Sequence, residues 1–117
     1  MSKVSTIKIQ VGLDDQKVPE SIEWSATDNK EERMVKAKGM IVSFWDPAEK
    51  VALRIDLWTK DMMVDEMADF FFQTMMTMAD TYGRATPYKD QADDMRAFAK
   101  DFFKKFQDKQ AAEEAGK

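Results

Sequence analysis

The stretch that most constrains the fold is residues 51–82, where an alternating strand leads into a long amphipathic helix. In Val51–Trp58 apolar and polar residues alternate, which is typical of a strand that buries one face. The apolar positions of this strand are Val51, Leu53, Ile55 and Leu57. We therefore expect Ile55 and Leu57 to be buried.

The predicted helix runs from about Met63 to Tyr82, with Asp61 as its N-cap and Gly83 as its stop. Its apolar positions recur at spacings of three and four, as one face of an amphipathic helix requires. They are Val64, Met67, Phe71, Met75, Met78 and Tyr82. The predicted helix therefore presents a Met- and Phe-rich face.

Three more strands are predicted before this segment, at Ser5–Leu13, Ser21–Ala26 and Met34–Trp45. Pro19 precedes the second strand closely, which suits an edge strand. In the third strand the apolar alternation changes phase near Gly39, which indicates a β-bulge. The alternative for that strand is burial on both faces, with Ile41 and Trp45 covered as well.

A second helix is predicted after Thr86 and Pro87, which suit an N-cap and a first turn. Its apolar positions are Tyr88, Ala92, Met95, Ala99, Phe102 and Phe106. Strands followed by helices predict an α+β fold, a four-stranded antiparallel sheet with two C-terminal helices packed on one face. We expect a single domain over residues 1–109 and a polar, frayed tail over 110–117.

Composition excludes several classes of function. The net charge is −4 with both signs interspersed, whereas nucleic-acid binding needs a concentrated basic surface. The chain has no cysteine, so disulfides and thiolate chemistry are ruled out. No apolar run approaches the roughly 18 residues of a membrane span, and none near the N-terminus resembles a signal peptide. A soluble, cytoplasmic protein is expected.

The chain also lacks histidine, the usual general base and the commonest metal ligand. Asp61, Asp65 and Asp69 repeat at a spacing of four, so a weak Mg²⁺ or Ca²⁺ contact is conceivable. Acidic residues are expected in a first helical turn without any ligand, and we therefore predict no metal site there. We expect no catalytic residues, no cofactor and no enzymatic activity.

Methionine and phenylalanine are in surplus. The chain has 10 methionines and 8 phenylalanines. A Met and Phe stripe at helical spacing is normally core, but three consecutive phenylalanines, 70–72, cannot all face one sheet. The residues beyond what the fold covers form the candidate interface: Trp58, Phe70, Phe72, Met76 and Phe103. We predict self-association, most simply as a dimer, with Phe72 and Met76 as the outward pair.

The segments Ile22–Asp28, Leu53–Met62, Val64–Met67 and Ala79–Tyr82 together resemble the gliding-motility protein C (GldC) family of Bacteroidetes. The run Arg-Ile-Asp-Leu-Trp-Thr-Lys-Asp, residues 54–61, is distinctive, and the likeness covers nearly the whole chain. The family has Pro where this chain has Met63. The resemblance implies a small soluble accessory protein of the gliding machinery, with no catalytic residues to carry over.

Three functions stay open. The resemblance favours a non-enzymatic adaptor that binds a protein of the gliding machinery. Four antiparallel strands followed by two helices also resemble the export chaperone SecB, and Met-rich surfaces suit varied unfolded clients. A small-molecule binder or enzyme with a pocket between sheet and helices ranks last, because histidine, cysteine and a phosphate-binding loop are missing.

Overall fold

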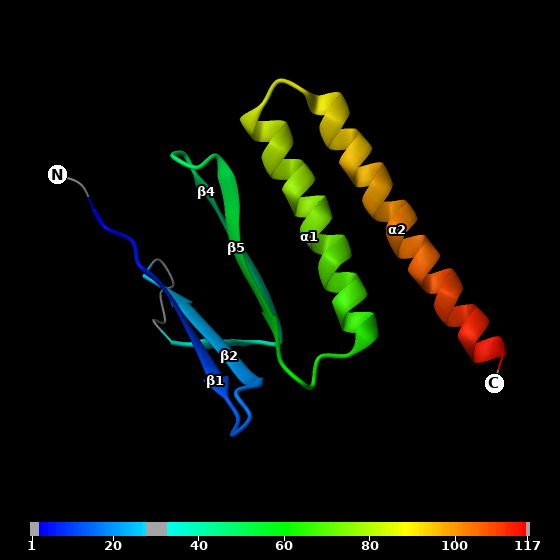
Figure 1. Ribbon diagram of the computed structural model, residues 1–117. Helices are drawn as coiled ribbons and strands as arrows, with labels where there is room; N and C mark the ends of the chain where they lie inside the picture. Colours follow the sequence, from blue (N-terminus) through cyan, green and yellow to red (C-terminus); the bar gives the residue numbers. More distant parts are fainter. Residues whose placement is uncertain (1–2, 28–32, 117) are drawn as a thin grey trace. The chain divides into compact units, whose positions relative to one another are not determined.

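The computed structural model describes residues 3–27 and 33–116. Over these residues the protein is α+β and divides into two compact units, one ending at Met62 and the other beginning at Met63 (Figure 1). The first unit contains the described strands, and the second contains the two helices. A single domain over residues 1–109 stays a prediction, as does the packing of both helices on one sheet face.

A three-stranded antiparallel sheet is formed by β1 (Ile7–Leu13), β2 (Pro19–Ala26) and β3 (Val35–Ala37), in that order. β2 is its central strand, so the prediction that this strand lies at an edge is wrong. Pro19 occupies the first position of β2, where a proline is tolerated because its missing N–H interrupts few ladder bonds. Ile22 of β2 is buried and belongs to the core of this unit.

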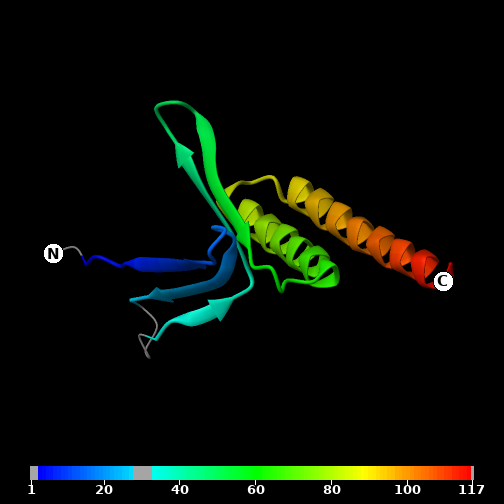
Figure 2. The ribbon, with the colours of Figure 1, turned by 60° about the horizontal axis from the view of Figure 1, so that its bottom comes forward.

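The predicted strand Met34–Trp45 is broken at Lys38. Its second half, β4 (Gly39–Asp46), leaves β2 and pairs with β5 (Val51–Trp58) in a separate two-stranded antiparallel sheet. In Figure 2 this hairpin projects away from β1, β2 and β3. Antiparallel pairing is confirmed, but one four-stranded sheet is wrong. The change of phase near Gly39 marks where the chain changes sheets.

The first helix, α1 (Val64–Ala85), begins and ends differently from the prediction. Its N-cap is Met63, not Asp61, and the Met63 N–H donates to the Glu66 carboxylate over 3.0 Å. Glu66 thus reaches back from the third helical position to the N-cap N–H, whereas an N-cap Asp61 would have accepted from N–H groups of the first turn. Gly83 does not stop the helix, because α1 continues to Ala85.

Thr86 is the C-cap of α1 and not the N-cap of the next helix. Its hydroxyl donates to the Tyr82 carbonyl over 2.9 Å and accepts from the Tyr88 N–H over 3.3 Å. The second helix, α2 (Lys89–Ala115), starts after Tyr88. It continues through most of the segment that was expected to fray.

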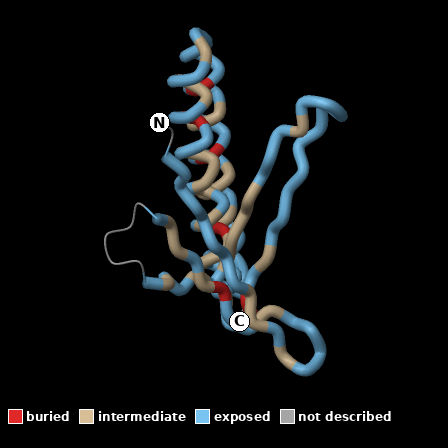
Figure 3. Tube along the Cα trace, turned by 90° about the vertical axis from the view of Figure 1, so that its left-hand side faces the viewer, coloured by how far each residue is buried: buried red, intermediate tan, exposed pale blue. Residues whose placement is uncertain are grey.

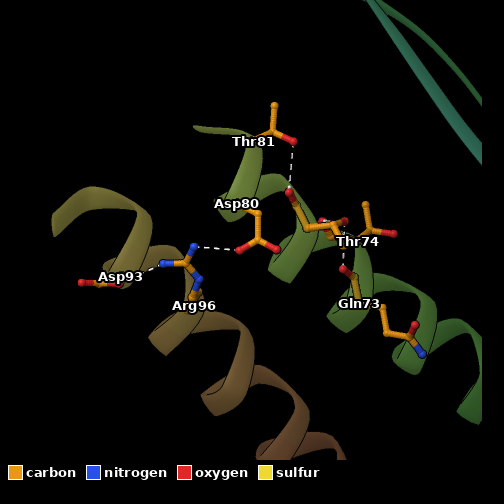
Figure 4. Close-up of polar contacts among 7 residues, drawn as sticks. Gln73, Thr74, Asp80, Thr81, Asp93 and Arg96 are labelled. Carbon is orange, nitrogen blue, oxygen red and sulfur yellow. Dashed lines mark hydrogen bonds and ion pairs between the residues drawn. The ribbon is translucent and has the colours of Figure 1, made fainter. Parts of the chain in front are cut away.

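Small residues bring the two helices close together. Ala68, Ala79, Ala92 and Ala99 are the buried residues of the helix pair. A Cβ atom on Gly83 would lie 3.4 Å from the Ala92 Cβ, so the helices also approach closely near their connection. The Arg96 guanidinium of α2 lies 2.7 Å from the Asp80 carboxylate of α1 (Figure 4). The hydrogen bond to Asp80 is the largest cause of the raised pKa of Arg96.

Candidate functional site

The register of the β4–β5 hairpin collects apolar side chains on one side. Cross-strand partners share a side of the ladder, and here they include Met40 with Leu57, Val42 with Ile55, and Phe44 with Leu53. We call this set the apolar hairpin face: Met40, Val42, Phe44, Leu53, Ile55 and Leu57. Its two strands therefore contribute an uninterrupted apolar surface with no polar side chain among the six.

This face is largely exposed. The exposed fractions are 61% for Phe44, 54% for Leu53 and 53% for Ile55, and most of the hairpin is coloured as exposed in Figure 3. The prediction that Ile55 is buried is wrong, and Leu57 is half-buried. The reason is that β4 and β5 form a sheet of their own. Each of the two strands therefore has side chains of another strand beside it on one flank alone.

The opposite side of the hairpin is mixed in character. Arg54 and Asp56 form an ion pair over 2.7 Å there, and both side chains are well exposed. Trp45 and Trp58 lie on the same side and are 66% and 56% exposed. The hairpin thus has one apolar side and one side on which the Arg54–Asp56 ion pair lies between Trp45 and Trp58.

The residues after β5 are fixed by polar contacts. Thr59 is 2% exposed, and its N–H donates to the Lys38 carbonyl over 2.8 Å. Its hydroxyl donates to the Asp61 carboxylate, and this hydrogen bond is the largest cause of the lowered pKa of Asp61. Thr59 is therefore a buried polar residue whose hydrogen bonds hold the break at Lys38 against the end of β5.

Lys60 connects the same segment to the β1–β2 turn. Its Nζ lies 2.8 Å from the Asp14 carboxylate. This hydrogen bond, with the Val18 and Gln16 N–H groups that donate to the other carboxylate oxygen, lowers the pKa of Asp14 to about 2. The pKa of Lys60 is raised by the same contact. Asp14 and Asp61 therefore both bind groups of the fold itself.

An open pocket of about 490 Å³ lies beside Thr59 within the first unit. Its walls carry the acidic residues Glu20, Glu23 and Asp61 and the basic residues Lys36 and Lys38. Mixed charge of this kind does not form the concentrated surface that a phosphate or a nucleic acid requires. Over residues 3–27 and 33–116, no group of three His, Cys, Asp or Glu side chains could hold a metal ion.

The predicted interface residues belong to both units, Trp58 to the first and the other four to the second. Trp58 is exposed on the hairpin. Phe72 of α1 lies against Phe103 of α2 with 5.0 Å between ring centroids, so it is not the outward ring that we predicted. Phe71, which is 42% exposed, contacts Phe70 edge-on. Met76 is half-buried in α1. The interface role of Trp58 and the four helix residues stays a prediction.

Sequence reasoning missed the apolar hairpin face as a surface. Its alternation was recognised, but alternation says only that two sides differ, not that one of them is covered. Exposure of this face depends on the break at Lys38, where the chain leaves the three-stranded sheet. No residue pattern on β5 itself could have indicated it.

These features define a small α+β protein with an exposed apolar surface on its two-stranded sheet. A model of the GldC-like family, described as gliding motility-associated protein GldC-like, matches residues 19–108. The chain belongs to this family, and the resemblance noted in its sequence is confirmed. No curated protein and no solved structure matches the chain. In the described part of the chain, neither helix is long and apolar enough to cross a bilayer.

Proposed function

We propose that the protein is a non-enzymatic accessory component of the bacterial gliding machinery that binds a protein partner through the apolar hairpin face. The family supports the association with gliding motility. The observation that carries the binding role is the exposure of Phe44, Leu53 and Ile55 side by side on one surface. Exposed apolar patches of this kind are typical of protein interaction sites.

Energetics favour a bound state for this surface. Fully burying a side chain the size of Leu, Ile or Phe contributes about 1.5–3 kcal/mol, and because these three are 53–61% exposed, covering the rest contributes roughly half of that each. Three such residues side by side can therefore anchor an interface, provided that the ordering cost of association is met. A cytoplasmic site of action and self-association as a dimer belong to the same proposal.

Affinity purification from a gliding bacterium tests the proposal. A tagged wild-type chain should retain one stoichiometric machinery protein, and Phe44→Glu should lose it. Ser43→Glu is the matched control, because Ser43 is the adjacent exposed residue on the opposite side of the hairpin. Loss of the partner in both variants, or in neither, would contradict binding at this face.

A holdase for unfolded or exported chains is the alternative function, and the same exposed apolar surface favours it. The two differ in what they bind. A holdase would suppress the aggregation of several unrelated unfolded proteins at stoichiometric amounts, and an adaptor would not. The same pair of variants, Phe44→Glu and Ser43→Glu, applies to that assay.

A further inference from the structure

The outer edge of β5 has no strand partner. Over residues 3–27 and 33–116, β5 is hydrogen-bonded into a ladder with β4 alone. An isolated two-stranded hairpin is marginally stable in water, and an unpaired edge is a template for pairing with another chain. Prolines and bulges protect such edges in many proteins. Val51–Trp58 contains no proline and pairs with β4 without a register shift.

We propose that β5 pairs antiparallel with β5 of a second copy of this chain, about a two-fold axis at Ile55. Arg54 then lies opposite Asp56 of the second copy, and by symmetry this pair occurs twice. On the other side of the ladder, Leu53 lies opposite Leu57 of the second copy, and Ile55 lies opposite its own equivalent. The product is a four-stranded sheet with one continuous apolar face. This inference rests on the proposed self-association and specifies its geometry.

The charges of Arg54 and Asp56 favour this register over the adjacent registers. An axis at Arg54 would place two arginines opposite each other, and an axis at Asp56 would oppose two aspartates, which is destabilising. An axis between two residues would place apolar side chains opposite charged ones and mix the two faces. Of these positions, only the axis at Ile55 matches opposite charges.

Geometry and size fit the same register. Within one chain Arg54 uses Nε and Nη2 to bond a single oxygen, Oδ2, of Asp56. Its Nη1 and the Asp56 Oδ1 can therefore bond across the axis as charge-assisted hydrogen bonds. The large Trp58 ring would lie opposite the small side chain of Ala52 of the second copy, so the ends of the paired segment are also complementary.

Single-cysteine variants test the register, since the chain has no cysteine of its own. Directly opposed residues in antiparallel strands have Cα atoms about 4.5–5.5 Å apart, within the disulfide range of about 4.4–6.8 Å. Ile55→Cys should therefore form a disulfide-linked dimer on mild oxidation. Ala52→Cys, at a position that is also exposed but far from its symmetry equivalent, should not. No linked dimer at position 55, or equal linkage at both positions, would overturn the pairing.

Charge reversal provides the second test, with the dimer measured by sedimentation and light scattering. Arg54→Glu should weaken the dimer about tenfold, because two attractive pairs become repulsive. Adding Asp56→Arg in the same chain should restore it. A wild-type chain that stays monomeric would overturn both the pairing and the self-association. A dimer that is insensitive to these substitutions would overturn the pairing alone, and neither result affects the partner binding tested with Phe44→Glu.

Discussion

The Lys60 ammonium lies 2.8 Å from the Asp14 carboxylate, so the segment that follows β5 is tied to the turn between β1 and β2. Val18 and Gln16 donate their N–H groups to the same aspartate. One carboxylate therefore closes the β1–β2 turn and also binds the residue next to buried Thr59. Its protonation should affect both contacts at once.

We predict that Asp14 titrates near pH 2 and that Lys60→Met raises its pKa toward the ordinary value. Because the folded-state pKa is lowered, the stabilising contribution of Asp14 is present above its unfolded pKa, near 3.8, and is lost as the pH falls through about 2. Carboxyl chemical shifts followed by NMR measure this directly. Lys50→Met, in the other turn, is the control and should leave the titration of Asp14 unchanged.

The hydroxyl of Thr59 is predicted to matter for stability. Thr59→Val keeps the shape but removes the hydroxyl that donates to the Asp61 carboxylate, which is itself exposed to solvent. Because Asp61 can be hydrated, we expect a loss of about 0.5–1.5 kcal/mol in the free energy of unfolding, together with a rise in the pKa of Asp61. Denaturant unfolding and NMR titration check the two effects. Thr81→Val, at an exposed hydroxyl on α1, should change stability by less than about 0.5 kcal/mol.

The two neighbouring rings on α1 should behave differently. Phe72 packs against Phe103 of α2, whereas Phe71 is 42% exposed. Phe72→Ala should lower the free energy of unfolding by about 2–4 kcal/mol, somewhat less than the roughly 3–5 kcal/mol for a fully buried ring. Phe71→Ala should cost clearly less. Thermal unfolding measures both, and equal losses would contradict the placement of Phe72 between the helices.

The helix contact at Ala99 leaves no room for a larger side chain. Ala99 is fully buried, whereas its neighbour Ala97 is exposed. Ala99→Leu should lower stability by about 1–3 kcal/mol through overpacking. Ala97→Leu serves as the matched control and should be nearly neutral. An Ala99→Leu variant as stable as the wild type would show that the helices are not closely packed there.

Local patterns predicted the elements well because they depend on residues near in sequence. The strand at Val51–Trp58 and the helix that begins near Met63 follow from period-two and helical spacing. The turn at Asp46 follows from its side chain, which accepts from the Ala48 and Glu49 N–H groups. Each of these predictions needed only neighbouring residues.

Contacts between distant segments were beyond the sequence. Alternation in Met34–Trp45 could not show that the chain changes sheets at Lys38, because β2 and β5 are equally good partners for such a strand. Three consecutive phenylalanines likewise could not show which ring faces α2, since α1 is apolar around much of its surface. The exposure of Ile55 follows from the first of these and was therefore missed.

The most direct test of the binding role is gliding itself. A gliding bacterium should carry Phe44→Glu or Ser43→Glu in its own copy of the gene, and the speed of single cells should be measured at equal protein levels. The apolar hairpin face predicts that Phe44→Glu abolishes or strongly slows gliding and that Ser43→Glu moves like the wild type. Normal gliding with Phe44→Glu would contradict it.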